Sequence, residues 1–198
     1  MPKVLVTGAT GFIASHTTLA LIDKGYEVRG TARSADKAAG LNATLSRYAG
    51  KPVDIELVAA DLTSDAGWAE AMAGIDYLQH LASPFPATAP RHADELIIPA
   101  REGALRALTA AKAAGVKRAV MTSSMAAIGY GWGDQRPPVL DETHWSNPDN
   151  VKDNTAYARS KVIAEKAAWD YVAGEGKGLE LAVINPVAVL GPAMSADV

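Results

Sequence analysis

KVLVTGATGFIAS, residues 3–15, is the stretch that decides the fold of this chain. Its first five residues form a short, β-branched apolar run, which predicts a buried parallel strand. The run breaks at Gly8 into a glycine turn, and a helical pattern begins by Ile13. The stretch therefore predicts a strand, a tight turn and a helix in direct succession.

The glycine spacing in this stretch is G-x-x-G-x-x-A, one residue longer between its first two glycines than the usual dinucleotide fingerprint. Gly8 allows the sharp turn, Gly11 lets the backbone approach a pyrophosphate, and Ala14 lets the helix lie close to the sheet. The first N–H groups of the helix would then face the phosphates. Two glycines also occur in an ordinary strand–turn–helix. The rest of the chain therefore has to show whether this turn binds a dinucleotide.

Composition restricts the class of protein. The 198 residues make one large domain or one and a half, and a hydrophobic content of 48% is ample for a core. A net charge of −3 argues against a nucleic-acid-binding surface. Without cysteine, and with four histidines that lack ligand spacing, no metal site is predicted. We expect a cytoplasmic protein without a signal peptide or membrane partner, because no apolar run approaches the ~20 residues that span a bilayer.

Strand-like and helix-like segments alternate along the whole chain. Predicted strands cover residues 3–7, 27–31, 54–59, 77–81, 118–123 and 180–185, and predicted helices begin near residues 13, 41, 94 and 157. Residues 125–153 form a long loop rich in Gly, Pro, Asp and Trp, and such loops usually have a function. The alternation predicts an α/β fold, a doubly wound parallel sheet of the Rossmann type with three α/β/α layers.

The end of the second strand indicates which dinucleotide would bind. NAD sites place an acidic residue there, whereas this chain has Arg33, followed by Lys37. A guanidinium matches a 2′-phosphate in charge and geometry, so the pair favours NADP(H), although two solvated surface cations would look the same. After the third strand, Asp61 could accept from an adenine amino group while Leu62 covers the ring. A cap for the following turn explains Asp61 equally well.

Tyr157 and Lys161 open the last predicted helix and lie four residues apart, on one helix face. A nearby ammonium stabilises the phenolate form of a tyrosine, which assists proton transfer at neutral pH. The Y-x-x-x-K pattern is short and occurs by chance on amphipathic helices, so it gains meaning only beside the other motifs.

Taken together, the motifs resemble those of the extended short-chain dehydrogenases/reductases. The likeness is greatest to the branch of the NAD-dependent epimerase/dehydratase family that holds dihydroflavonol 4-reductases, cinnamoyl-CoA reductases and yeast-type aldehyde (carbonyl) reductases. The motifs that carry it span nearly the whole chain: residues 7–13 (TGATGFI), 30–34 (GTARS), 80–84 (HLASP), 122–124 (TSS), 141–145 (DETHW), 157–161 (YARSK) and 185–186 (NP).

The resemblance implies a role for each matching residue. The pyrophosphate would lie against Gly8, Gly11, Phe12 and Ile13, the 2′-phosphate against Arg33 and Lys37, and adenine between Asp61 and Leu62. Ser124 and Tyr157 would polarise the substrate carbonyl, Tyr157 would donate the proton, Lys161 would hold the ribose, and Pro186 would lie near the carboxamide. The implied activity is NADPH-dependent reduction of an aldehyde or ketone, a small-molecule substrate, by a monomer or homodimer.

Two departures from the family's pattern matter. Many relatives carry an asparagine near Gly103 that is thought to relay protons, and here Arg101 and Glu102 stand beside it. Relatives also continue well beyond Gly191 with a segment that forms most of the substrate pocket. We therefore expect residues 1–198 to be one NAD(P)-binding Rossmann domain that carries the catalytic residues, with most of that segment absent.

Two other functions stay open. One is a nucleotide-sugar epimerase or dehydratase that recycles bound NAD, which Arg33 disfavours. The other is a non-enzymatic NADP(H)-binding regulator, which the complete set of Ser124, Tyr157 and Lys161 disfavours.

Overall fold

The computed structural model describes residues 1–34, 36, 39–85, 88 and 90–194. Its centre is a six-stranded sheet with the order β3-β2-β1-β4-β5-β6, and every neighbouring pair is parallel. The strands are β1 (Lys3–Thr7), β2 (Glu27–Ala32), β3 (Glu56–Ala59), β4 (Tyr77–His80), β5 (Arg118–Thr122) and β6 (Glu180–Ile184). This strand order confirms the predicted doubly wound fold.

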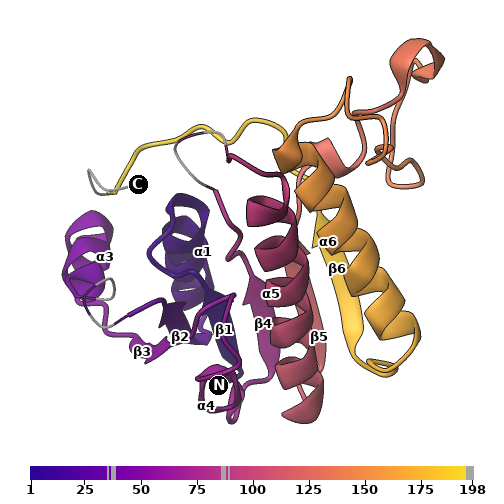
Figure 1. The fold of residues 1–198 in the computed structure, drawn as a ribbon. Coiled ribbons are helices and arrows are strands. Elements are labelled where there is room, and N and C mark those ends of the chain that lie inside the picture. Colours follow the sequence, from indigo (N-terminus) through magenta and orange to yellow (C-terminus); the bar gives the residue numbers. More distant parts are fainter. Residues whose placement is uncertain (35, 37–38, 86–87, 89, 195–198) are drawn as a thin grey trace.

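Helices cover both faces of the sheet (Figure 1). One face is covered by α1 (Phe12–Asp23) and α3 (Leu41–Ala49), and the other by α4 (Trp68–Met72), α5 (Asp94–Ala113) and α6 (Ala156–Ala173). The long predicted loop stays irregular except for two short 3₁₀ turns, η1 (Met125–Ala127) and η2 (Gly133–Gln135). None of the described helices combines the length and apolarity that a bilayer crossing requires.

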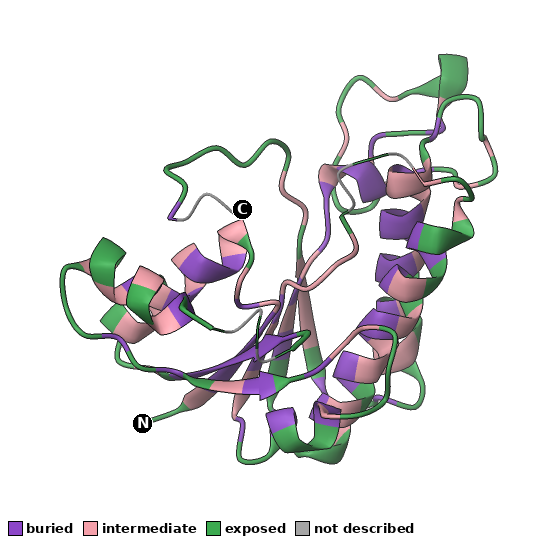
Figure 2. Ribbon diagram, turned by 60° about the vertical axis from the view of Figure 1, so that its left-hand side comes forward, coloured by how far each residue is buried: buried purple, intermediate pink, exposed green. Residues whose placement is uncertain are grey.

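The alternation of side chains along β1 creates two cores. Val4 and Val6 point to one face and pack with α1 and α3, while Leu5 points to the other and packs with α4 and α5. All three are at most 2% exposed, so both faces of this central strand are dry. Figure 2 shows the buried residues concentrated on the strands and on the helix faces turned toward them. This burial explains why β1 reads as a continuous apolar run.

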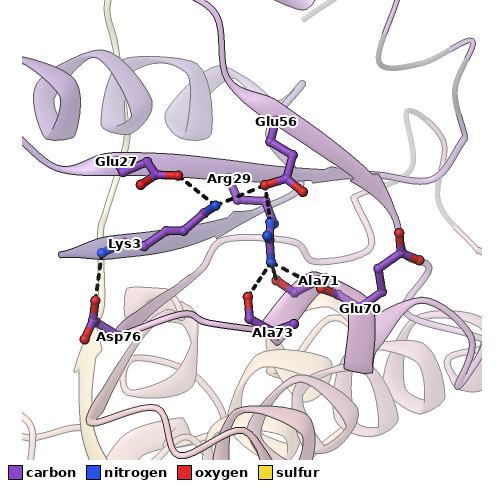
Figure 3. A network of polar contacts seen from close by, with 8 residues as sticks. All are labelled: Lys3, Glu27, Arg29, Glu56, Glu70, Ala71, Ala73 and Asp76. Carbon is purple, nitrogen blue, oxygen red and sulfur yellow. Dashed lines mark hydrogen bonds and ion pairs between the residues drawn. The ribbon is translucent and has the colours of Figure 1, made fainter. Parts of the chain in front are cut away.

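An ionic network near the amino-terminal ends of the strands holds the sheet to α4 (Figure 3). Arg29 on β2 is buried and donates to Glu56 on β3 at 2.7 Å. The same guanidinium donates to the main-chain oxygens of Glu70, Ala71 and Ala73 at 3.2, 2.9 and 2.8 Å, at the carboxyl end of α4, where helix carbonyls lack partners within the helix. The hydrogen bond from Arg29 lowers the pKa of Glu56.

The strand order reverses between β1 and β4. In open parallel sheets the crevice beside such a reversal, at the carboxyl ends of the strands, is where ligands bind. The segments that follow β1, β2, β3 and β4 meet at that edge. Residues 186–194 leave β6 and cross over the carboxyl ends of the strands toward α1 and α3 (Figure 1). There the Pro192 carbonyl lies 3.0 Å from the His16 Nε2, and the Met194 carbonyl accepts from Arg47 at 3.2 Å.

Candidate active site

The glycine turn between β1 and α1 forms one wall of the site. Gly8 has a φ of +63°, and the Gly11 N–H donates to the Gly8 carbonyl at 2.9 Å. A Cβ on Gly8 would lie 3.1 Å from the Cα of Ala82, so a side chain here would press the turn against the segment after β4. Gly11 caps α1 in an extended conformation, without a side-chain cap and without an acidic residue in the first turn. The positive end of the α1 dipole is therefore not neutralised by its own side chains.

The end of β2 fixes the position of this turn. Thr31 accepts the Gly8 N–H through its hydroxyl at 3.2 Å and the Ala9 N–H through its carbonyl at 2.8 Å. A glycine inside β2 allows the approach, because a Cβ on Gly30 would lie 2.7 Å from that of Ala9. The conformation of the turn is thus fixed by hydrogen bonds to β2, which do not depend on a ligand.

A cavity of about 1050 Å³ extends along the carboxyl ends of β1 to β4. It is large enough for a dinucleotide, since ordinary small-molecule sites occupy roughly 300–1,000 Å³. Of the residues singled out from the sequence, those that line it are Gly8, Gly11, Arg33, Asp61 and Leu62. Its wall does not include the other predicted site residues that the structure describes, namely Phe12, Ile13, Ser124, Tyr157, Lys161 and Pro186. Lys37 lies outside the described residues.

Asp61 stabilises the turn that follows it, which is one of the two roles that the sequence allowed. Its Oδ1 accepts from the N–H and the hydroxyl of Thr63 at 2.7 and 2.5 Å. These hydrogen bonds lower the pKa of Asp61, with smaller contributions from the positive charges of Arg33 and Arg106. No bond to Oδ2 is found in the described part of the chain, so the turn leaves an acceptor on this cavity-lining residue.

Leu62 is held against the wall by α5. A Cβ on Gly103 would lie 2.6 Å from the Leu62 Cδ2, so only glycine at this helix position lets the leucine approach. Gly103 therefore has a packing role.

Thr7 and His80 end the two strands beside the reversal. The Thr7 hydroxyl accepts from the N–H groups of Leu81 and Ala82, both at 3.0 Å, and lies 3.0 Å from the His80 Nδ1. With both acceptor positions used, its proton is left for Nδ1, so His80 carries its own proton on Nε2. Burial, with a smaller effect of Lys161, lowers the pKa of His80 to about 4. His80 is thus a neutral structural histidine rather than an acid–base catalyst near pH 7.

Lys161 connects the cavity to the catalytic tyrosine candidate. Its Nζ donates to the Ser83 hydroxyl on the cavity wall at 3.0 Å and lies 5.5 Å from the centre of the Tyr157 ring. Burial lowers the pKa of Lys161 to about 8, against an opposing effect of Glu165. One ammonium therefore binds a residue of the cavity wall and lies near the tyrosine ring.

Tyr157 stands in the first turn of α6, which Thr155 caps by accepting the Ala158 N–H at 3.1 Å. Its ring is half-buried and meets the exposed ring of Phe85 edge to face, with centres 5.5 Å apart. Phe85 lines the cavity, so the phenol stands at the cavity's border.

Ser124 lies directly after β5 and is buried. Its Oγ accepts the Ala126 N–H at 3.1 Å and so caps η1. This hydrogen bond fixes the hydroxyl oxygen and leaves its proton free to be donated. The Oγ of the preceding Ser123 is buried without a hydrogen-bond partner in the described structure.

A second cavity of about 640 Å³ lies on the η1 side of Ser124. Its wall mixes polar and apolar surface and consists of Met125, Ile128, Gly129, Arg136, Pro137, Pro138, Leu140, Asn185 and Val187. Two of these residues flank Pro186, whose carbonyl accepts the Met125 N–H at 2.8 Å. Pro186 therefore joins the end of β6 to the segment that carries Ser124.

Sequence reasoning missed several residues that the fold brings to this region. Ser83 belongs to the quoted HLASP motif, which could have drawn attention to it. Glu165 continues the four-residue spacing of Tyr157 and Lys161 by one more step, and Asn185 belongs to the quoted NP motif. Their partners lie 20 to 78 positions away, so no local pattern reveals them.

Comparisons with curated proteins give several similar reductases. Cinnamoyl-CoA reductase 1 of Petunia hybrida is 39% identical over 196 residues, covering 98% of this chain and 56% of the relative. A putative NADPH-dependent methylglyoxal reductase of Candida albicans is 38% identical over 202 residues, covering 96% of this chain and 59% of the relative. The chain thus spans just over half the length of these curated relatives.

Solved structures give the same picture. The yeast methylglyoxal/isovaleraldehyde reductase Gre2, crystallised with NADPH, matches with a TM-score of 0.79 and 30% identity over 98% of this chain and 60% of that one. Vestitone reductase from alfalfa matches with a TM-score of 0.75 and 32% identity over 93% of this chain and 56% of that one.

The model of the NAD dependent epimerase/dehydratase family matches residues 4–197. This match includes both the glycine turn and the Tyr157–Lys161 pair, and it agrees with the parallel strand order and with the reductase relatives. The chain belongs to the NAD dependent epimerase/dehydratase family.

Proposed function

We propose that this chain is the cofactor-binding and catalytic part of an NADPH-dependent reductase that acts on the carbonyl of an aldehyde or ketone. The observation that carries the proposal is the position of Lys161, within hydrogen-bond distance of the cavity wall at Ser83 and 5.5 Å from the Tyr157 ring. A group that must hold a ribose and also tune a phenol needs both contacts at once. The similar reductases support the same reaction.

The cavity suits a dinucleotide. In the proposed arrangement Gly8 and Gly11 leave room for the pyrophosphate, and the N–H groups of Phe12 and Ile13 at the uncapped start of α1 attract its charge. The exposed cation of Arg33, with Lys37 beyond it in sequence, takes the 2′-phosphate. Oδ2 of Asp61 accepts from adenine while Leu62 covers the ring, and Pro186 supplies backbone near the carboxamide.

Two side chains would act on the substrate oxygen, and a third would act on the phenol. When bound, NADPH supplies the hydride. The Ser124 hydroxyl has its oxygen fixed by the Ala126 N–H, so its proton is aimed at the developing oxyanion. Tyr157 donates the proton, and the Lys161 ammonium stabilises the phenolate that remains.

Tyr157→Phe gives the direct test. The change removes one oxygen from the transition state and almost nothing from the cofactor site. We expect NADPH binding, measured by fluorescence titration, to persist. NADPH oxidation with a panel of aldehydes, ketones and flavanonols should slow about 10²–10⁴-fold, the usual contribution of a positioned general acid.

Tyr171→Phe is the matched control, because this tyrosine stands on the same helix and packs against the core instead. Unchanged turnover in Tyr157→Phe would refute the proposed role. NADPH binding without turnover of any carbonyl would point to the regulator, and copurified NAD would point to the epimerase or dehydratase.

A further inference from the structure

Glu165 is a buried carboxylate that forms no ion pair with any residue that the structure describes. It is 5% exposed, and its oxygens accept from two neutral donors, the Asn185 Nδ2 at 2.8 Å and the Trp169 Nε1 at 3.4 Å. A buried charge without a counter-charge is costly, so its retention at the centre of α6 needs a reason.

Lys161 is the matching buried cation, one helical turn earlier on the same face of α6. It is 7% exposed, and its hydrogen-bond partner in the described structure is the neutral Ser83 hydroxyl. Burial works against its charged form, and Glu165 is the group that works in the opposite direction on its pKa. The two charges do not touch, yet at low dielectric they interact over one helical turn.

The other groups packed around Lys161 do not supply a negative charge. From β4 comes His80, which is neutral, and from α6 itself comes Tyr157. The buried residues of α5, the helix next to α6, are all Ala, Gly, Leu or Ile, and Ser124 with η1 brings a hydroxyl, a thioether and methyl groups. Within the described chain, Glu165 is therefore the counter-charge available to this ammonium.

Glu165 also reaches Ser124. The Asn185 Nδ2 that donates to Glu165 donates as well to the Ser124 main-chain oxygen at 3.2 Å. This amide joins the end of β6 to the end of β5 at the point where Ser124 turns into η1. With one carboxylate oxygen holding the amide, the orientation of Asn185 is determined.

We propose that Glu165 is a positioning residue of the catalytic site: its carboxylate is the counter-charge of the Lys161 ammonium and, through Asn185, the anchor of the Ser124 main chain. This inference rests on the proposed function for its catalytic meaning. The two contacts themselves can be measured without any cofactor.

Glu165→Gln separates the charge from the hydrogen bond, because an amide oxygen can still accept from Asn185. In the ligand-free protein, the titration of Lys161 can be followed by side-chain NMR and assigned with Lys161→Arg. We expect a midpoint near 8 in the wild type, and one lower by on the order of one pH unit in Glu165→Gln. Glu175→Gln, an exposed change beyond the end of α6, should leave the midpoint in place. Equal midpoints in all three proteins would overturn the counter-charge role.

Glu165→Leu removes both contacts and tests the anchor. Relative to Glu165→Gln, it should shift the carbonyl resonance of Ser124 and lower kcat a further tenfold or so, with little change in KM. An unmoved Ser124 resonance would overturn the anchor. If neither the wild type nor the variants reduce a carbonyl, the proposed function fails, while the NMR results still decide the role of Glu165.

Discussion

Arg33 is the residue on which the choice between two cofactors depends. It is exposed at the end of β2, lines the large cavity and acts electrostatically on Asp61. A lost charge-assisted hydrogen bond is worth about 1.5–3 kcal/mol. Arg33→Ala should therefore weaken NADPH binding roughly tenfold or more and hardly affect NADH, as measured by titration calorimetry.

Arg91 provides the control for this prediction, because it lines the same cavity. If Arg91→Ala weakens NADPH as much as Arg33→Ala does, the effect comes from the general positive field. An equal loss for NADH and NADPH in Arg33→Ala would show that Arg33 does not contact the 2′-phosphate.

His80 predicts how the stability of the fold responds to acid. Its pKa is lowered from 6.5 to about 4 by burial, so between these values the unfolded chain binds a proton that the folded chain does not. Stability therefore falls as the pH drops from 6.5 toward 4, by about 3 kcal/mol for this group.

His80→Asn isolates this contribution, since an amide oxygen can still accept the Thr7 proton at the place of Nδ1. Urea unfolding at several pH values should give the variant a shallower decline than the wild type below pH 6.5. The carboxylates that also titrate in this range are common to both proteins and cancel in the comparison. If the free energy of unfolding falls in parallel with pH in both proteins, His80 takes up its proton as readily in the folded state as in the unfolded state.

Among the secondary-structure elements, α4 depends most on a single side chain. It has five residues, too few to be stable alone, and Arg29 donates to three carbonyls at its end. Arg29→Met should destabilise the fold by about 3 kcal/mol, because it removes the donor of the Ala71 and Ala73 carbonyls and one of the two cations that pair with Glu56. Urea denaturation measures the loss.

Arg118→Met is the matched control at the same edge of the sheet. Arg118 pairs with Glu180, but the two side chains are 58% and 64% exposed, so their ion pair is worth at most about 1 kcal/mol. Similar losses in both variants would show that the carbonyls of α4 find water when Arg29 is removed.

The elements that were easy to predict are those with a clear apolar pattern. β1, β2, β4, β5 and β6 agree with the sequence within a residue. The third strand begins at Glu56 rather than at Asp54, because the Ile55 N–H donates to Asn42 instead of to a strand. Ile55 is buried, so its alternation with polar neighbours reflects the burial of its side chain and not membership of the strand. The sequence did not predict α4, because five residues show no helical period.

The candidate site divides in the same way. Gly8, Arg33 and Tyr157 could be named because each has a distinctive residue type at a distinctive place in the chain. Ser83 and Asn185 acquire meaning only from partners that the sheet brings near them. A three-dimensional neighbour of this kind leaves no trace in a single sequence.

For the molecule as a whole, the two ends of the parallel strands have different roles. The network of Lys3, Arg29 and Glu56 lies near the amino-terminal ends (Figure 3), and the cavities lie near the carboxyl ends. The groups that stabilise the sheet are therefore separated by the length of the strands from those proposed to bind ligands.

The central position of β1 has a consequence for synthesis on the ribosome. Val4 pairs with Val28 on one side but with Tyr77 on the other, and the Thr7 hydroxyl reaches His80, 73 residues away. At about 5–20 residues per second, β1 waits roughly 4–15 s after its own synthesis for β4 to follow. During that interval an apolar strand with one open edge is exposed to other nascent chains. Nascent chains ending before β4 should thus be the ones that holdase chaperones retain.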